Sequence, residues 1–356
     1  MSEKTIPSTS ILDMVCPAPL TSNDTVLLGH GSGGKLSNDL VRDVFLPALG
    51  NPELAQLNDQ AVVRVGSTKI AMTTDSFVVK PLFFRGGDIG SLAVHGTVND
   101  LAVGGATPLF LTAAFVIEEG LPMDVLRRVV LSMQQAAEAA GVRVVAGDTK
   151  VVEKGKGDGL FINTTGIGVV PEHIELSADR AQPGDAIILS GSIGEHGITI
   201  LAEREGLEFE SAVESDSAAL NGLCAEILQA SLEVRCMRDL TRGGLSSALN
   251  EIAAQSNVGV ELNESSIPVR DEVRGACEML GLDPLYVANE GKLIAIVAAE
   301  AANSVLEAMR SHTHGVNAQI IGRVTSSLPG LVTMKTPLGT SRIVDMLAGD
   351  QLPRIC

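Results

Sequence analysis

Hydrophobic and polar positions recur along this chain with two periods, one typical of strands and one typical of helices. Residues 61–79 and 108–119 are rich in Val, Ile, Phe and Thr, which favours strands. Residues 123–141 repeat apolar side chains at helical spacing, and Gly141 supplies a stop signal. The apolar side of this predicted helix is formed by Val125, Leu126, Val129, Val130, Met133 and Ala137.

The same alternation continues through the rest of the first half. Residues 88–108 predict a helix that ends in a glycine-rich turn, and residues 142–152 and 159–170 predict two strands. A polar stretch with a Pro-Gly pair breaks the pattern at residues 175–185 and indicates a domain boundary.

The second half repeats the style of the first. It predicts strands at residues 186–197 and 292–300, helices at 247–257 and 301–310, and a closing strand at 318–324. Strands that alternate with helices in two halves of similar size indicate an α/β (α+β) fold with two domains, related by an ancient duplication.

Four segments follow from these patterns. Residues 1–40 form a leader with a glycine-rich loop, residues 41–175 an N-terminal α/β domain, and residues 176–325 a C-terminal α/β domain. Residues 326–356 are turn-rich and are predicted to be a flexible tail that ends in a cysteine.

Composition narrows the class of partner. The net charge of −17 argues against nucleic acid and anionic membranes, which need a basic face. No apolar run approaches the roughly 20 residues that span a bilayer, and the N-terminus lacks the apolar core of a secretory signal. We expect a cytoplasmic protein.

The five cysteines form no CxxC pair, which fits a reducing compartment. Cys224 and Cys277 share helical faces with apolar residues and are predicted to pack in the core, as is Cys236. Cys16 has no assigned role. Cys356 is the last residue, where a thiol cannot be held by neighbours on both sides.

Six acidic or amide side chains stand where a strand or helix meets a turn. One Asp at a turn is usually a cap or an Asx-turn. Together in space, however, these side chains would supply hard oxygen ligands for Mg²⁺ and, through it, a nucleotide triphosphate. The candidates are Asp59, Asp75, Asn99, Asp100, Asp148 and Asp239.

Two glycine-rich stretches are candidates for phosphate binding. Residues 29–35 could wrap phosphates with the N–H groups around Gly31, Gly33, Gly34 and Lys35, although a flexible connector is an equal alternative. The stretch that includes Arg242 places a glycine pair at the start of a helix, whose N-terminus favours anions.

Two further residues are candidates for proton transfer. Glu290 precedes a strand and could be a buried acid or base. Lys150 follows Asp148 by two positions and could contact phosphate or substrate, the alternative being a solvated surface lysine.

The motifs "NDQAVV", "TTDSFVV", "VNDLAVGGATPLFLTAAFVIEEG", "AGDTKVV", "PGDAIILSGSIGEHG", "RDLTRGGL" and "NEGKL" occur in this order. The set resembles the PurM-like superfamily of ATP-using enzymes, which includes aminoimidazole ribonucleotide synthetase, selenophosphate synthetase and thiamine-monophosphate kinase. With the ending "PRIC", the chain is most similar to the HypE family of carbamoyl dehydratases, which act in hydrogenase maturation.

That resemblance implies two PurM-like domains, a homodimer and a Mg²⁺-ATP site in the N-terminal domain. It implies that Asp75, Asn99, Asp148 and Arg242 bind ATP. Cys356 would receive a carbamoyl group from the carbamoyltransferase HypF. ATP-dependent dehydration to a thiocyanate, with Glu290 and Lys150 positioning the group and taking its protons, would yield a cyanide for the HypC-HypD complex and the iron of [NiFe] hydrogenase.

A mobile carrier explains a cysteine at the chain end, since a tail of about ten residues reaches roughly 33 Å. Its own α-carboxylate should raise the pKa of the Cys356 thiol, with Arg354 offsetting part of the effect, so the thiol is a carrier and not an activated nucleophile. The alternatives are another enzyme of the superfamily, such as a selenophosphate synthetase that uses Cys16 or a small-molecule kinase, and a non-catalytic cysteine carrier or metallochaperone.

Overall fold

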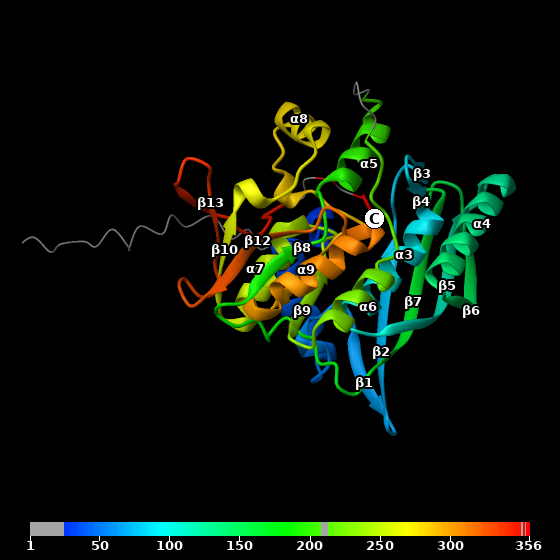
Figure 1. Cartoon of the computed structure of the whole chain (residues 1–356). Helices are drawn as coiled ribbons and strands as arrows, with labels where there is room; N and C mark the ends of the chain where they lie inside the picture. Colours follow the sequence, from blue (N-terminus) through cyan, green and yellow to red (C-terminus); the bar gives the residue numbers. More distant parts are fainter. Residues whose placement is uncertain (1–24, 208–212, 350–351, 353) are drawn as a thin grey trace, which may run out of the picture.

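The computed structural model describes residues 25–207, 213–349, 352 and 354–356. These residues form two large sheets and one short hairpin, with helices between and around them (Figure 1). Cys16 and residues 1–24 of the predicted leader lie outside the described residues. None of the helices in the described ranges is long and apolar enough to cross a membrane.

The first half folds into a five-stranded sheet in the order β1-β2-β7-β5-β6. Only β5 and β6 run parallel, because the crossover helix α4 connects them. The strands are β1 (Ala61–Val65), β2 (Thr68–Phe77), β5 (Thr107–Glu118), β6 (Arg143–Val152) and β7 (Leu160–Val170), and a short hairpin joins β3 (Phe83–Phe84) to β4 (Gly87–Asp88).

Helices α3 (Ile89–Val103) and α4 (Met123–Ala140) follow the sequence prediction closely. Asp88 caps α3 by accepting hydrogen bonds from Gly90 N and Ser91 N. On α4, Val129, Met133 and Ala137 are buried as predicted, but the Val130 side chain is exposed. The apolar stripe of α4 is therefore narrower than the sequence pattern predicts.

The second half folds into a seven-stranded sheet in the order β14-β13-β10-β12-β8-β11-β9. Its strands are β8 (Ala186–Leu189), β9 (Val234–Asp239), β10 (Gly259–Asn263), β11 (Leu293–Val297), β12 (Gln319–Thr325), β13 (Val332–Lys335) and β14 (Ser341–Ile343). Its helices are α5 (Glu195–Glu205), α6 (Asn221–Ala230), α7 (Gly244–Ser256), α8 (Asp271–Leu280) and α9 (Ala302–Ser311).

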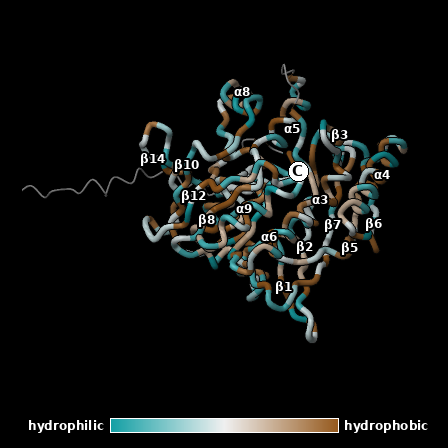
Figure 2. The backbone as a smooth tube through the Cα atoms, viewed as in Figure 1, coloured by the Kyte–Doolittle hydropathy of each residue, from teal (hydrophilic) through white to brown (hydrophobic). Residues whose placement is uncertain are grey.

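Both faces of this second sheet are covered, which explains the unbroken apolar runs of its central strands. Ile187 and Leu189 of β8 pack into the cluster that contains α7, whereas Ile188 packs into the cluster that contains α6 and α9. Figure 2 shows hydrophobic segments along the strands of both sheets and hydrophilic segments on the outer helices. The predicted core positions of Cys224, Cys236 and Cys277 are confirmed, because all three are buried.

Helix α3 joins the halves, since it packs on β2 and β7 of the first sheet and also contacts β9 and α6 of the second. Ala102 and Val103 at its end belong to the apolar cluster of the second half. Twelve of the fifteen residues of α3 are buried. Because the C-terminal end of α3 packs into the second half, the residues there lie at the boundary between the domains.

Two segment boundaries need correction. The predicted tail 326–356 is too long, because β13 and β14 belong to the second sheet, with β13 paired to β10. The predicted end of the leader at residue 40 falls inside a continuous helical stretch that runs through α1 (Lys35–Leu40), a wide turn at Val41–Phe45 and α2 (Leu46–Leu49). The short, turn-like sequence of the predicted tail concealed a hairpin of β13 and β14 that joins the sheet through β10, which is distant in sequence.

Candidate functional site

Three of the predicted metal ligands converge where the two domains meet. Oxygen atoms of Asp59, Asp100 and Asp239 all lie within 4.8 Å of one another. Asp59 precedes β1, Asp100 lies near the end of α3, and Asp239 is the last residue of β9, so both domains contribute. Among the described residues, the buried Oδ2 of Asp239 has no hydrogen-bond partner.

The carboxyl groups of this acid cluster carry raised pKa values. Burial, opposed in part by Arg238, raises the pKa of Asp59 to about 6. Burial and the neighbouring carboxylates raise the pKa values of Asp100 and Asp239 well above the usual range. A divalent cation would relieve this repulsion, and the unpartnered oxygen of Asp239 would be a ligand for it, so the residues present fit a Mg²⁺ site.

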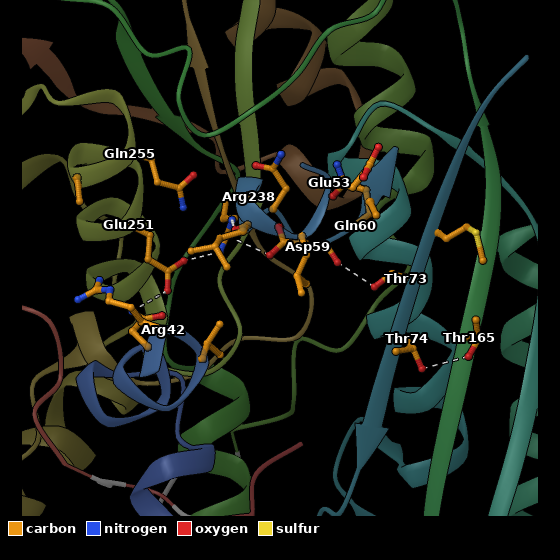
Figure 3. Close-up of a pocket in the computed structure, with 18 of the residues that line it drawn as sticks. Arg42, Glu53, Asp59, Gln60, Thr73, Thr74, Thr165, Arg238, Glu251 and Gln255 are labelled. Carbon is orange, nitrogen blue, oxygen red and sulfur yellow. Dashed lines mark hydrogen bonds and ion pairs between the residues drawn. The ribbon is translucent and has the colours of Figure 1, made fainter. Parts of the chain in front are cut away.

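A pocket of about 600 Å³ opens beside the acid cluster (Figure 3). Its wall combines Asp59 with polar side chains of β2 and β7, such as Thr74 and Thr165. On the opposite side, Arg238 binds Asp59 at 3.0 Å and also pairs with Glu251 of α7. Arg238 and Glu251 are absent from the sequence prediction, although Arg238 directly precedes Asp239 in the motif that was recognised.

Asp75 lies close to the acid cluster on β2. Burial raises the pKa of Asp75 and Arg242 opposes this shift, while the charge of Asp75 contributes to the raised pKa values of Asp100 and Asp239. Its Oδ1 accepts a hydrogen bond from Ser76 N at 2.7 Å. Asp75 therefore borders the acid cluster and has one carboxylate oxygen left for a ligand.

Asn99 does not contribute an oxygen to the acid cluster, which corrects the sequence prediction. Its buried Oδ1 accepts a hydrogen bond from Leu220 N at 2.7 Å, and its Nδ2 donates to Ala218 O at 3.0 Å. On a helix, consecutive residues point in different directions, so Asp100 faces the cluster while Asn99 faces the 217–220 segment.

Asp148 and Lys150 are likewise not brought to the acid cluster within one chain. Both lie on β6, an edge strand whose residues are almost all exposed. Lys150 Nζ is 2.6 Å from Asp148 Oδ2, and their side chains are 68% and 61% exposed. This pair matches the solvated-lysine alternative in the isolated chain.

The first glycine-rich loop is closed by contacts inside the chain. Gly33 N donates to Ser37 Oγ at 2.9 Å and Lys35 N donates to Leu347 O at 2.8 Å, so neither N–H points to a free phosphate position. Gly33 has φ +73°, and a Cβ there would lie 2.6 Å from Arg242 Cβ. The connector alternative fits this arrangement, in which the two predicted glycine stretches pack on each other.

The chain end is docked between the domains. Val78 N donates to a carboxylate oxygen of Cys356 at 2.9 Å, and Lys80 N donates to Arg354 O at 3.3 Å, which is the pattern of a short antiparallel pairing. Ile355 and Cys356 are buried, 6% and 8% exposed, beside a cavity of about 150 Å³ lined by Arg242 and Ser76.

Burial raises the pKa of the Cys356 thiol to about 12, which confirms the expected direction but changes the main cause. The compensating cation is Arg242, while the Arg354 guanidinium pairs with Asp158 instead. Arg242 also donates to Gly31 O at 2.9 Å. A thiol held protonated in this way suits a carrier and not an attacking group.

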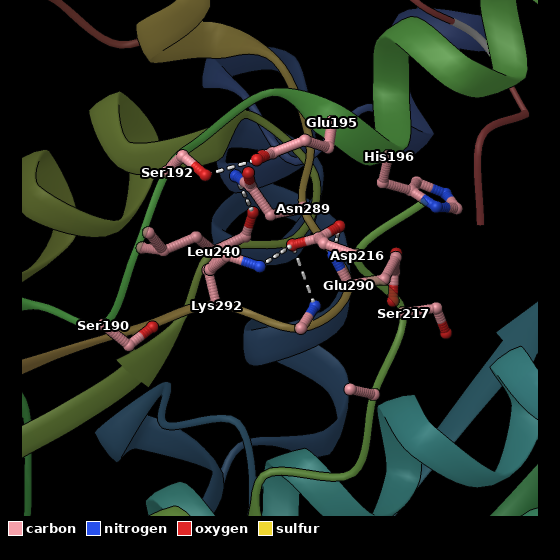
Figure 4. Close-up of polar contacts among 12 residues, drawn as sticks. Ser190, Ser192, Glu195, His196, Asp216, Ser217, Leu240, Asn289, Glu290 and Lys292 are labelled. Atoms are coloured by element: carbon pink, nitrogen blue, oxygen red, sulfur yellow. Dashed lines mark hydrogen bonds and ion pairs between the residues drawn. The ribbon is translucent and has the colours of Figure 1, made fainter. Parts of the chain in front are cut away.

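Glu290 is the carboxyl group whose charge acts most strongly on the docked cysteine. Burial, with Asp239 and Asp75 nearby, raises the pKa of Glu290 well above its usual range, and its charge contributes to the raised pKa of Cys356. Its Oε1 is buried and has no partner in the described part of the chain. Figure 4 shows the Glu290 backbone beside Asp216 and Lys292.

The fold and this site define a duplicated α/β protein with an acid cluster between its domains, and family models give this class a name. The AIR synthase related protein N-terminal domain matches residues 57–170, and the corresponding C-terminal domain matches residues 182–332. These are the ATP-using PurM-like domains of the predicted superfamily.

More similar relatives narrow the class. Carbamoyl dehydratase HypE of Azotobacter vinelandii is 59% identical over 334 residues, which cover 94% of this chain and 98% of that protein. A crystal structure of a HypE-HypF complex matches with TM-score 0.83 and 49% identity, covering 86% of this chain and 99% of that one. A HypE structure in complex with ATP matches with TM-score 0.79 and 51% identity, covering 93% and 100%. The chain belongs to the HypE family.

Proposed function

We propose that this chain is an ATP-dependent carbamoyl dehydratase that converts a carbamoyl group on its own Cys356 to a thiocyanate. The observation that carries the proposal is the docked chain end, which places the thiol beside Glu290 and Arg242, within the electrostatic reach of Asp75. A scaffold that only carried a metal on Cys356 would not need this buried acidic surrounding.

The nucleotide is assigned to the pocket of about 600 Å³ beside the acid cluster. Mg²⁺ held by Asp59, Asp100 and Asp239 would neutralise charge on the triphosphate and help to orient its γ-phosphoryl group. Arg242, between this cluster and Cys356, would balance negative charge on the carried group.

The proposed reaction removes the oxygen of the carbamoyl group, which is a poor leaving group. Phosphorylation of the thiocarbamate oxygen by ATP makes phosphate the leaving group, and loss of the two amide protons forms the C≡N bond. The products are the thiocyanate, ADP, phosphate and one net proton. Glu290 is assigned to proton exchange with the amide, since its Oε1 is free of other partners among the described residues and its raised pKa makes it a stronger base than an ordinary carboxylate.

HypF is the proposed carbamoyl donor, because a solved relative was crystallised as a HypE-HypF complex. The HypC-HypD complex is the proposed acceptor of the cyanide. Loading and unloading require the chain end to leave its buried position, since Cys356 is only 8% exposed and a second protein cannot reach its thiol there.

A homodimer is the proposed assembly. Strand β6 presents an unpaired edge, and Val144, Val145 and Val151 on it are 44%, 56% and 66% exposed. A groove of about 680 Å³ between β6 and α4 continues this apolar face and includes Val130. Pairing of this face with a second copy would cover it and would bring Asp148 and Lys150 near the partner's site.

The test is to incubate the protein with carbamoyl phosphate, HypF and Mg²⁺-ATP, and to analyse the mass of the C-terminal peptide. We expect a carbamoyl adduct on Cys356, followed by loss of one water that requires hydrolysable ATP. Cys356→Ala should abolish both products while ATP binding and the melting temperature stay unchanged. An adduct that loses water equally fast without nucleotide would refute the proposal, as would a Cys356→Ala protein that no longer binds ATP.

A further inference from the structure

The 215–218 segment holds the backbone of Glu290. Asp216 Oδ1 accepts a hydrogen bond from Glu290 N at 3.1 Å, and its Oδ2 accepts from Gly291 N at 3.2 Å and from Lys292 Nζ at 3.0 Å (Figure 4). Ala218 N in turn donates to Glu290 O at 3.3 Å. Glu290 therefore cannot move relative to this segment without breaking several hydrogen bonds.

The same segment is fixed to the first domain. Ser215 N donates to Arg85 O at 3.0 Å, and Ser217 Oγ lies 3.0 Å from His95 Nδ1 of α3. The segment thus has contacts on both sides of the domain boundary. It can hold groups from both domains in fixed positions relative to one another.

His196 connects this segment to the docked chain end. The ring is fully buried in the first turn of α5 and packs edge-on against Phe84. Its Nδ1 lies 2.7 Å from Ser215 Oγ, and its Nε2 lies 2.6 Å from the carbonyl oxygen of Ile355, the residue before the carrier cysteine.

The partners determine which ring nitrogen carries the hydrogen. A carbonyl oxygen only accepts, so Nε2 must donate to Ile355 O. In a neutral ring Nδ1 then has no hydrogen and accepts one from Ser215 Oγ, whose oxygen also accepts from Ser217 N at 3.1 Å. A directed chain of hydrogen bonds thus runs from Ser217 through Ser215 and His196 to the backbone of the tail.

We infer that His196, as the neutral Nε2–H tautomer, is a positioning residue that ties the carrier cysteine to the segment that fixes Glu290. The dehydration role of this contact rests on the proposed function. The docking role does not, because it concerns only whether the tail stays in its groove. Burial lowers the pKa of His196, which agrees with a neutral ring.

Two matched variants separate the contacts of the two ring nitrogens. In His196→Gln the amide nitrogen can take the place of Nε2 and reach Ile355 O, whereas in His196→Asn the shorter amide can reach only Ser215. The rate of Cys356 alkylation, followed by mass analysis of the C-terminal peptide, reports how often the tail leaves its groove.

We expect His196→Asn to raise the alkylation rate roughly three- to tenfold, as for loss of one net hydrogen bond, and His196→Gln to stay within about twofold of the wild type. In single turnovers of preloaded protein, His196→Asn should slow dehydration by a similar factor with unchanged ATP affinity. Equal effects of the two variants, or no effect of either on alkylation, would overturn the inference. Absence of any dehydration in the wild type would instead refute the proposed function alone.

A second measurement keeps His196 unchanged. Deleting Ile355 and Cys356 removes the acceptor, so the ¹⁵N signals of the His196 ring should shift away from those of a hydrogen-bonded Nε2–H tautomer. Unchanged ring signals after this deletion would contradict the contact even if both His196 variants failed to fold.

Discussion

The acid cluster and the Asp148–Lys150 pair were predicted from the same set of sequence motifs, yet the cluster is buried or half-buried and the pair is exposed. Asp239 is 6% exposed and meets Asp59 and Asp100 across the domain boundary. Asp148 and Lys150 pair only with each other on an open edge strand, more than half exposed. This difference fits the homodimer proposed above, in which one chain completes the metal-binding half of the site and a second copy supplies Asp148 and Lys150.

Complementation between two inactive variants is the strongest test of whether Lys150 acts in the site of a second copy. Asp239→Asn should lower Mg²⁺-ATP binding and Lys150→Ala should slow dehydration, each by about a hundredfold or more. If Lys150 acts across a dimer, mixed and re-equilibrated variants should regain about a quarter of the wild-type activity, because one site in each mixed dimer carries neither change. A mixture that stays inactive would place both residues in one chain's site.

A charge on the open face of β6 should separate the copies. Val145→Asp places an ionised group where we propose that a partner packs, and its desolvation should shift the protein to monomers in light scattering and remove most activity. Leu338→Asp is the matched control, since Leu338 is 91% exposed on a turn of the second domain. A Val145→Asp protein of unchanged size would refute this interface.

The alkylation rate of Cys356 should depend on pH differently in a buried thiol and in an exposed one. Burial raises the thiol pKa from an ordinary 9.0 to about 12, so the docked state binds the proton more tightly than the free tail. Docking is therefore at full strength below pH 9 and weakens as the pH rises toward 12. We expect the alkylation rate of Cys356 to keep rising above pH 9, whereas a free peptide of the same ending levels off there. A plateau near pH 9 in the intact protein would argue against a docked thiol.

The smallest expected effect concerns the ion pair at the mouth of the groove. Arg354 pairs with Asp158, whose pKa is lowered chiefly by this contact. Both side chains are about one-third exposed, so Asp158→Asn should speed Cys356 alkylation by only about two- to threefold. Glu172→Gln, which removes the exposed pair with Arg64, is the control and should leave the rate unchanged. A larger effect of the control would mean that net charge, and not this contact, governs docking.

The family was recognised from the sequence because local signals were sufficient, and three of the predicted metal ligands, Asp59, Asp100 and Asp239, lie together in the structure. Gly141 takes a left-handed conformation at the end of α4 as its position predicted, and the strands of the first sheet occupy the expected residues. Asn99 was assigned wrongly as a cluster ligand because adjacency to Asp100 in the sequence says nothing about direction on a helix. The 326–356 tail was overextended because β13 and β14 are short strands, and the β13–β14 hairpin joins the sheet only through the distant partner of β13, β10.

By itself, the sequence determined the alternation of strands and helices, the two-domain duplication and the residue types that a metal-nucleotide site requires, since these depend on periodicity and local chemistry. Only the tertiary structure decided which acids meet, that the chain end lies in a groove beside Val78, and that His196 holds it there. These outcomes depend on the packing of residues far apart in the chain, as His196 and Ile355 are, and on the burial that this packing creates. The charge and proton affinity of Cys356 and Glu290 follow from that burial and not from their neighbours in sequence.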